Sequence, residues 1–207
     1  MKLIVDILMF ILMTLQFMRG YIPPIFHEIS GIVLFVLVIV HLILNKNYIK
    51  NLFKGRYNFN RALMAIIAIG FFATFFTSAI LGMFSSQEAL IFLNRGNYNI
   101  NHAHKVISFI SLIILSLHLG INFNAMFGKL FNKFSKTVFY IVEGVIIICG
   151  IYSFIDLDLI TLVSGRFGFS SFDGNPYIIY IEYISVILMI TFLTYNVTKF
   201  ANKINNK

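Results

Sequence analysis

Long apolar runs separated by short polar connections dominate the pattern of this 207-residue chain. Six of these runs approach the length that a helix needs to cross a bilayer, about 20 residues at a rise of about 1.5 Å per residue. The pattern therefore predicts an all-α integral membrane helix bundle of about six transmembrane helices. The predicted spans are Leu3–Met18, Ile25–Leu44, Ala62–Phe84, His104–Phe123, Val138–Phe154 and Tyr177–Tyr195.

Composition agrees with a membrane domain and leaves room for little else. Hydrophobic residues make up 59% of the chain and charged residues 12%, whereas a soluble domain has roughly 45–50% and 25%. We therefore expect one transmembrane domain over residues 1–207. No G-x-G-x-x-G or phosphate-binding loop occurs, so the chain has no nicotinamide or flavin domain of its own. It is expected to be a component of an oxidoreductase system at most, and not a stand-alone enzyme.

The net charge of +8 follows the predicted connections. The basic residues lie in short segments between apolar runs, which favours membrane topology over nucleic-acid binding as their role. The positive-inside rule then places both termini in the cytoplasm. Twelve of the sixteen basic residues are predicted on that side: Lys2, Lys46, Lys50, Lys54, Arg56, Arg61, Lys129, Lys133, Lys136, Lys199, Lys203 and Lys207.

Four histidines recur with equal spacing in the second and fourth spans. His27 and His41 are 14 residues apart, and so are His104 and His118. Fourteen residues make nearly four helical turns, so each pair shares one helix face and is separated by roughly 21 Å along the axis. Because the two spans run in parallel in the predicted topology, His27 is expected opposite His104, and His41 opposite His118.

Two facing imidazoles at one depth are what a six-coordinate haem iron needs as axial ligands, and helix bundles build cofactor sites between facing helices. We therefore predict two b-type haems, an outer one held by His27 and His104 and an inner one held by His41 and His118. Small residues on the ligand faces would leave room for the porphyrin. These are Gly31, Ser108 and Ser111, whereas His102 is out of phase and is interpreted as interfacial.

Three other classes of protein remain open at this point. A zinc or copper site would use the same imidazoles, although the 14-residue spacing separates them into two distant pairs. A transporter would also place ionisable residues in its spans, but typically with broken helices. A structural subunit would bind no cofactor, and its histidines would serve hydrogen bonding between helices.

The motifs around these histidines resemble the flavinylation-associated membrane cytochromes, a bacterial family. The resemblance covers residues 1–128, from "VDILMFILM" through the H-E-x-x-G opening of the second span to S-L-H-L-G in the fourth. Residues 137–197, with spans five and six, lie outside it. The chain also departs from relatives that carry a further histidine and an aromatic residue after the last motif, since it has Asn122 and Phe123 there.

The resemblance implies a bis-histidine cytochrome in the bacterial inner membrane. Such a protein would pass electrons from quinol or a cytoplasmic donor to an extracytoplasmic flavin-carrying protein.

Four acidic residues also lie within the predicted spans. Asp6 lies near the cytoplasmic edge and is interpreted as extending to the interface. Glu143 and Glu182 are each interpreted either as proton carriers at a quinone site or as hydrogen-bonded groups inside the bundle. Glu28 adjoins His27, but adjacent helix positions do not face each other, so its carboxylate is expected to point elsewhere.

Overall fold

The computed structural model describes residues 2–52, 54, 59–124, 135–166 and 174–205, which form helices and no strand. The all-α prediction is confirmed. The helices are α1 (Lys2–Gln16), α2 (Pro24–Leu44), α3 (Lys46–Leu52), α4 (Phe59–Phe84), the 3-10 turn η1 (Ile91–Leu93), α5 (Tyr98–Ile121), α7 (Lys136–Asp156), α8 (Leu159–Ser164) and α9 (Pro176–Asn205).

Five of these helices, α2, α4, α5, α7 and α9, are long and apolar enough to cross a membrane. They make the chain a multi-pass membrane protein. The first predicted span differs, because α1 has only 15 residues. At about 1.5 Å per residue it is roughly 22 Å long, shorter than the hydrocarbon core of about 30 Å. The described residues therefore contain five candidate spans where the sequence pattern predicted six.

Three of the long helices begin with residues that are favourable at a helix N-terminus. Pro24 occupies the first turn of α2, where its missing N–H is no loss. The Asn97 side chain accepts a hydrogen bond from the Asn99 N–H at the start of α5. The Ser135 hydroxyl accepts one from the Val138 N–H at the start of α7. Such caps satisfy backbone donors that the helix leaves free.

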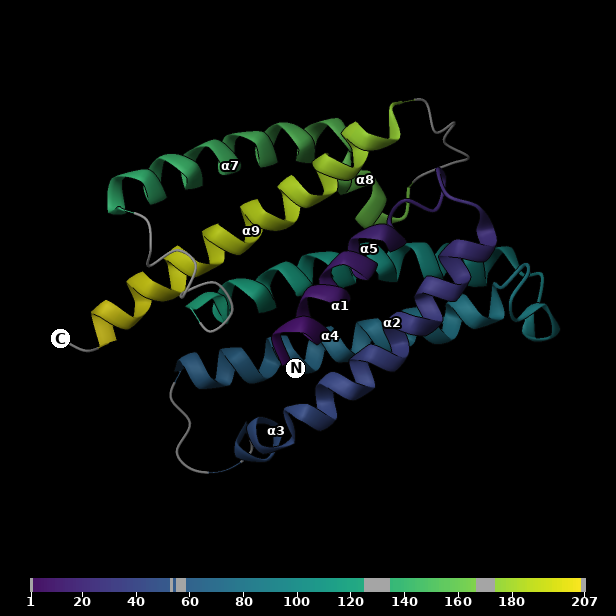
Figure 1. The fold of residues 1–207 in the computed structure, drawn as a ribbon, viewed down its shortest axis with the longest axis horizontal. Helices are drawn as coiled ribbons and strands as arrows, with labels where there is room; N and C mark the ends of the chain where they lie inside the picture. The colour runs from purple at the N-terminus through teal and green to yellow at the C-terminus, as the bar shows by residue number, and fades with distance from the viewer. Residues whose placement is uncertain (1, 53, 55–58, 125–134, 167–173, 206–207) are drawn as a thin grey trace.

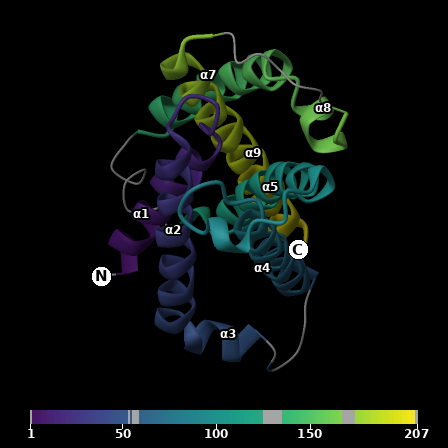
Figure 2. The same cartoon turned by 90° about the vertical axis from the view of Figure 1, so that its right-hand side faces the viewer.

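The bundle consists of three helix pairs, α1 with α2, α4 with α5, and α7 with α9 (Figures 1 and 2). The first two pairs meet α9 through α1 and, more extensively, α5. Four side chains on α5 and α9 are among the most deeply buried: Leu112, Val186, Ile187 and Phe192. The joint between α5 and α9 is therefore the centre of the core.

Two glycines allow α9 to approach its neighbours closely. A Cβ at Gly120 of α5 would lie 2.5 Å from Cβ of Thr194, and one at Gly150 of α7 would lie 2.3 Å from Cβ of Met189. Across the first contact, the Thr191 hydroxyl donates to the Ser116 carbonyl at 3.2 Å. Small residues at such contacts are typical of membrane helices, whose association depends on close packing and interhelical hydrogen bonds.

We expect Gly150→Ala to destabilise the bundle by about 1–3 kcal/mol, because the added methyl overpacks the contact between α7 and α9. Gly144→Ala, on the same helix, is the matched control, since no atom lies within 4 Å of a Cβ built there. Thermal unfolding in detergent measures both. Equal melting temperatures for the two variants would contradict the close approach at Gly150.

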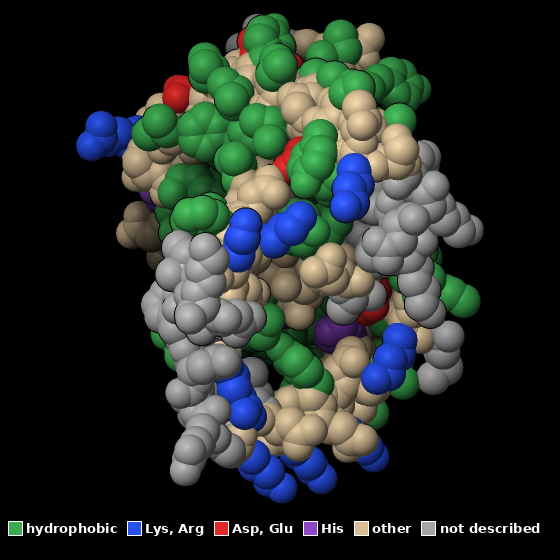
Figure 3. Space-filling view, turned by 90° about the vertical axis from the view of Figure 1, so that its left-hand side faces the viewer, with side chains coloured by type: hydrophobic (Ala, Val, Ile, Leu, Met, Phe, Trp, Pro, Cys, Tyr) green, Lys and Arg blue, Asp and Glu red, His purple; other side chains and the backbone are tan. Residues whose placement is uncertain are grey.

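The two ends of the bundle differ in charge. The end formed by the starts of α1, α4 and α7 and the ends of α2, α5 and α9 is here named the basic end. Figure 3 looks onto this end, where Lys and Arg side chains surround a hollow in which histidine surface is visible. Its basic residues are Lys2, Lys46, Lys50, Lys54, Arg61, Lys136, Lys199 and Lys203, and the predicted members Arg56, Lys129, Lys133 and Lys207 fall outside the described residues.

Candidate functional site

The structure brings His27 and His104 together at the opposite end of the bundle. Their ring centroids are 6.4 Å apart and the ring planes are at 81°. His27 belongs to the first turns of α2, and His104 lies two turns into α5. The 14-residue spacing predicted these two imidazoles at one level, and their ring contact agrees with that level.

The Nδ1 atoms of these two histidines have different surroundings. Nδ1 of His104 donates a hydrogen bond to the carbonyl oxygen of Ser78 at 2.8 Å. Since a carbonyl only accepts, this bond selects the tautomer in which Nε2 of His104 keeps its lone pair. Nδ1 of His27 is buried without a hydrogen-bond partner among the described residues. A buried nitrogen of this kind calls for an explanation, because nearly all such atoms are paired.

His41 and His118 form the corresponding level at the basic end. Nδ1 of His41 lies 2.7 Å from Oδ1 of Asp6, and both side chains are partly buried. The His118 imidazole stacks on the ring of Phe71, with centroids 5.9 Å apart and planes at 18°. His118 lies within electrostatic range of His41 and Asp6, but the described side chains here do not form a three-residue cluster that could hold a metal ion.

Asp6 is a residue whose role sequence reasoning missed. The sequence predicted a carboxylate that extends to the interface, whereas the structure shows it bonded to His41 on the neighbouring helix. Asp6 and His41 are 35 residues apart, so no local pattern relates them. The helical phase of α1 places Asp6 toward α2. The sequence did offer one signal for such a bond, because a single acidic residue in an apolar run is costly unless it is paired.

Aromatic side chains fill the space between the two histidine levels. The rings of Phe35 and Phe75 stack at 6.5 Å, those of Phe75 and Phe71 lie 6.0 Å apart, and Phe71 contacts His118. The backbones of α2 and α5, both fully described, scarcely approach each other, and α2 packs mainly on α1. The region between α2 and α5 is therefore built from imidazole and phenyl rings, the kind of surroundings that suit a flat apolar group.

The three small residues predicted to make room near the histidines have different surroundings. Gly31 lies against Gln16 of α1, whose Oε1 would be 3.3 Å from an added Cβ. The Ser108 hydroxyl lies 2.6 Å from that of Ser78 and donates to the His104 carbonyl at 2.7 Å. Ser111 is 1% exposed, and its hydroxyl has no partner among the described residues. Gly31 thus serves the packing of α1 on α2, and Ser108 adjoins the outer pair.

His102 lies apart from the two pairs, as its phase predicted. Its Nε2 donates to the carbonyl oxygen of Gly165 at 2.8 Å, and its ring lies 5.8 Å from that of Tyr98. Gly165 ends α8 in the left-handed region at φ 72°. His102 therefore fastens the end of α8 to α5, which is a structural role.

Glu28 points away from His27, as expected, and holds the segment between α4 and η1. Its carboxylate accepts hydrogen bonds from the Ser86 hydroxyl at 2.6 Å and from the N–H groups of Gln87 at 2.7 Å and Ala89 at 2.6 Å. The Glu88 N–H adds a longer contact. A single carboxylate thus organises the turn beside the outer histidine pair, since hydrogen bonds to a charged acceptor are the strong ones.

We expect Glu28→Gln to loosen this turn while the bundle stays folded. Each hydrogen bond to a charged group contributes about 1.5 kcal/mol or more, so amide exchange at Gln87 and Ala89 should accelerate about tenfold. Hydrogen exchange followed by mass spectrometry measures the effect. Glu88→Gln is the matched control, because the Glu88 side chain is exposed. Unchanged exchange in Glu28→Gln would contradict the anchoring role.

The buried carboxyl groups of α7 and α9 lie away from the histidines. Glu143 accepts a hydrogen bond from the Asn196 side-chain amide, across the contact between α7 and α9. Glu182 lies beside the carboxyl group of Asp156 across the same helix pair. Of the two interpretations of Glu143, the structure shows the hydrogen-bonded one.

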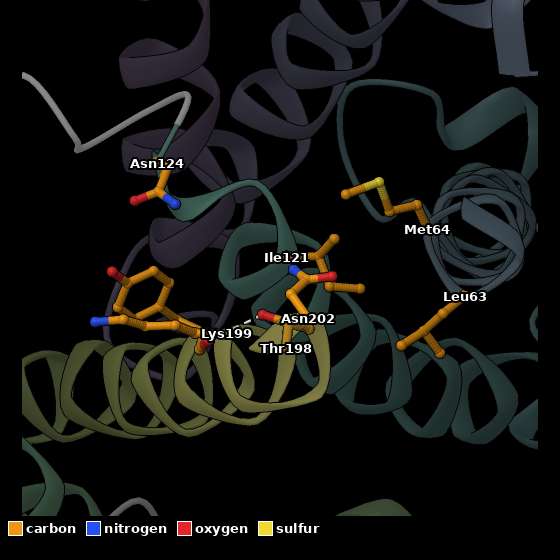
Figure 4. Close-up of a pocket in the computed structure, with 8 residues that line it drawn as sticks. Leu63, Met64, Ile121, Asn124, Thr198, Lys199 and Asn202 are labelled. Atoms are coloured by element: carbon orange, nitrogen blue, oxygen red, sulfur yellow. Dashed lines mark hydrogen bonds between the residues drawn. The ribbon is translucent and has the colours of Figure 1, made fainter. Parts of the chain in front are cut away.

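A cavity with a volume of about 190 Å³ lies at the basic end. Figure 4 shows Leu63 and Met64 on one side, Asn124 and Lys199 on the other, and Ile121, Thr198 and Asn202 between them. The polar lining comprises Asn124, Tyr195, Thr198, Lys199 and Asn202. Ile121 follows His118 by about one helical turn, so the cavity lies just beyond the inner histidine level. The second cavity, about 280 Å³, is almost entirely apolar and lies beside α8.

Within the described ranges, no three His, Cys, Asp or Glu side chains gather into a cluster that would hold a metal ion. Comparison of the chain with family models, curated proteins and solved structures finds no match. Fold and site together define an all-helical, multi-pass membrane protein in which the His27 and His104 imidazoles are in contact at one end of the bundle and His41 and His118 lie in the last turns of α2 and α5 at the other.

Proposed function

We propose that this protein is a dihaem b-type cytochrome that transfers electrons across a membrane. The observation that carries the proposal is the contact between His27 and His104, with centroids 6.4 Å apart. An imidazole nitrogen bonds a metal at about 2 Å and the ring centre lies about 1 Å behind it, so two axial imidazoles on one iron have centres about 6 Å apart. The measured separation fits that arrangement.

The surroundings of the imidazoles support the same function. Metal-bound histidines usually donate their second N–H to a carbonyl or a carboxylate, which fixes the tautomer and orients the ring. His104 does so toward Ser78 and His41 toward Asp6. Nδ1 of His27 is buried and has no hydrogen-bond partner in the described part of the chain. In this proposal His27 and His104 hold one haem and His41 and His118 hold the other.

The bound haems would supply reversible one-electron chemistry, and the protein residues set where it takes place. With two histidines holding each iron, no position would remain for a substrate, so the function would be electron transfer and not substrate oxidation. Phe35, Phe71 and Phe75 keep water out of the space between the two levels. In this proposal the two redox sites would lie about 21 Å apart along the helices.

Topology and partners follow from the charge distribution and from the resemblance noted above. The positive-inside rule assigns the basic end to the cytoplasm of a bacterial inner membrane, with both termini on that side. The acceptor is then an extracytoplasmic flavin-carrying protein. The donor is quinol or a cytoplasmic carrier, and the 190 Å³ cavity beyond His118 is where a small donor would bind next to the inner level.

The test is a dithionite-reduced minus oxidised visible spectrum of the purified protein, with haem counted by pyridine haemochrome. Two b-type haems per chain are expected. Protein that remains colourless after expression with ample haem would overturn the proposal, and metal analysis of the same sample would then show whether the imidazoles hold another ion.

A further inference from the structure

The hydrogen bond between the Asp6 carboxylate and His41 gives the inner histidine level an anionic partner that the outer level lacks. Their atoms are 2.7 Å apart, and the Asp6 and His41 side chains remain 22% and 24% exposed. A carboxylate on α1 that only extended to the interface would have no reason to meet α2. The contact instead ties the short first helix to the ligand-bearing face of the second.

Two further residues hold this pair in place. The Asn45 side-chain amide donates to the His41 carbonyl oxygen at 3.0 Å and lies 3.4 Å from each ring nitrogen. At that distance it competes weakly with the 2.7 Å bond to Asp6. The Lys2 ammonium, one turn before Asp6, donates to Oδ1 of Asn45 at 3.1 Å. The bond to Asp6 therefore leaves the proton of His41 on Nδ1 and a lone pair on Nε2, which lies 3.4 Å from the Asn45 amide nitrogen.

The outer level has a different partner at the equivalent position. Nδ1 of His104 meets the backbone carbonyl of Ser78 at 2.8 Å, and the Ser78 hydroxyl lies 3.3 Å away. Both are neutral groups. An anionic acceptor raises the basicity of an axial imidazole more than a neutral carbonyl does, and a more basic ligand stabilises ferric over ferrous iron.

We propose that Asp6 is a positioning residue for His41 and that it gives the inner site the lower reduction potential of the two. This inference rests on the proposed haem function. Asp6 acts through His41 and touches no cofactor. This difference in reduction potential favours electron transfer from the basic end toward the opposite end, the direction that an outer acceptor requires.

Redox potentiometry of Asp6→Asn in the full-length, haem-loaded protein tests the inference. Asparagine keeps the shape of the side chain but removes the charge, so the lower midpoint potential should rise while the higher one stays unchanged. Low-temperature electron paramagnetic resonance should change for one of the two ferric haems only. Asp158→Asn is the matched control, because Asp158 is exposed in the left-handed turn before α8, which asparagine tolerates, and should shift neither potential.

The outcomes separate this inference from the proposed function. Two bound haems with unchanged potentials in Asp6→Asn would overturn the role of Asp6 and leave the cytochrome function intact. Wild-type protein without haem would overturn the function itself. If Asp6→Asn loses one haem, Asp6→Glu decides the matter: recovery of that haem and its potential supports the carboxylate role, and failure to recover either overturns it.

Discussion

Replacing His104 with alanine is expected to remove one haem per chain and to leave the other bound. The two levels are separated by nearly four helical turns, so loss of a ligand at one level should not disturb the other. His41→Ala should remove the other haem and keep the one assigned to His27 and His104. The variant with both substitutions should bind no haem. Pyridine haemochrome and the reduced-minus-oxidised spectrum measure this directly, with one half of the α-band absorbance lost in each single variant.

His102→Ala provides the matched control for His104. The two residues are separated by a single position on α5, yet His102 bonds to the carbonyl of Gly165 and not to an imidazole. We expect it to keep both haems and to lose only stability at the end of α8. Retention of two haems in His104→Ala, or loss of one in His102→Ala, would contradict the assignment of the outer ligands.

Electron transfer across a sealed vesicle is expected to require both histidine levels. With protein in liposomes that enclose ferricyanide, external dithionite should bleach the trapped acceptor, and His104→Ala or His41→Ala should reduce the rate to that of protein-free vesicles. In the proposed function each single variant would lack one of two redox sites about 21 Å apart, and the path across the membrane would be interrupted. The absorbance of the trapped ferricyanide measures the rate.

His102→Ala should retain the wild-type rate in the same vesicles, which shows that reconstitution itself is unaffected by an α5 substitution. Wild-type rates in a variant that has lost one haem would mean that the second site does not lie on the path. Background rates for the wild type, with two haems bound, would show that the cofactors serve some function other than transfer across the membrane.

The helices could be predicted from the sequence because a bilayer leaves few alternatives. A long apolar run must satisfy its own backbone hydrogen bonds, and the helix is the element that does so within a single segment. The five spans of α2, α4, α5, α7 and α9 follow from this rule alone. The first run was harder to assign, because length and hydropathy do not reveal that α1 ends at Gln16 and packs on α2.

The histidine pairing was also available from the sequence. Equal 14-residue spacing on two parallel helices fixes which imidazoles share a level, and the 6.4 Å contact between His27 and His104 agrees with that rule. Helical phase also predicted that His102 and Glu28 would point elsewhere. These are properties of single helices, which depend only on position along the chain.

The groups that orient the imidazoles were decided by tertiary structure. Asp6 reaches His41 from another helix, and the Ser78 carbonyl reaches His104 from α4. The sequence does not indicate which backbone carbonyl will accept a hydrogen bond from a side chain on another helix. It also does not indicate which residue a single carboxylate will bond to. The sequence by itself determined an all-helical membrane bundle with histidines at two depths. Only the packing of α1 and α4 determined which nitrogen of His41 and His104 stays free, because hydrogen bonds between helices depend on rotation and approach that no periodicity encodes.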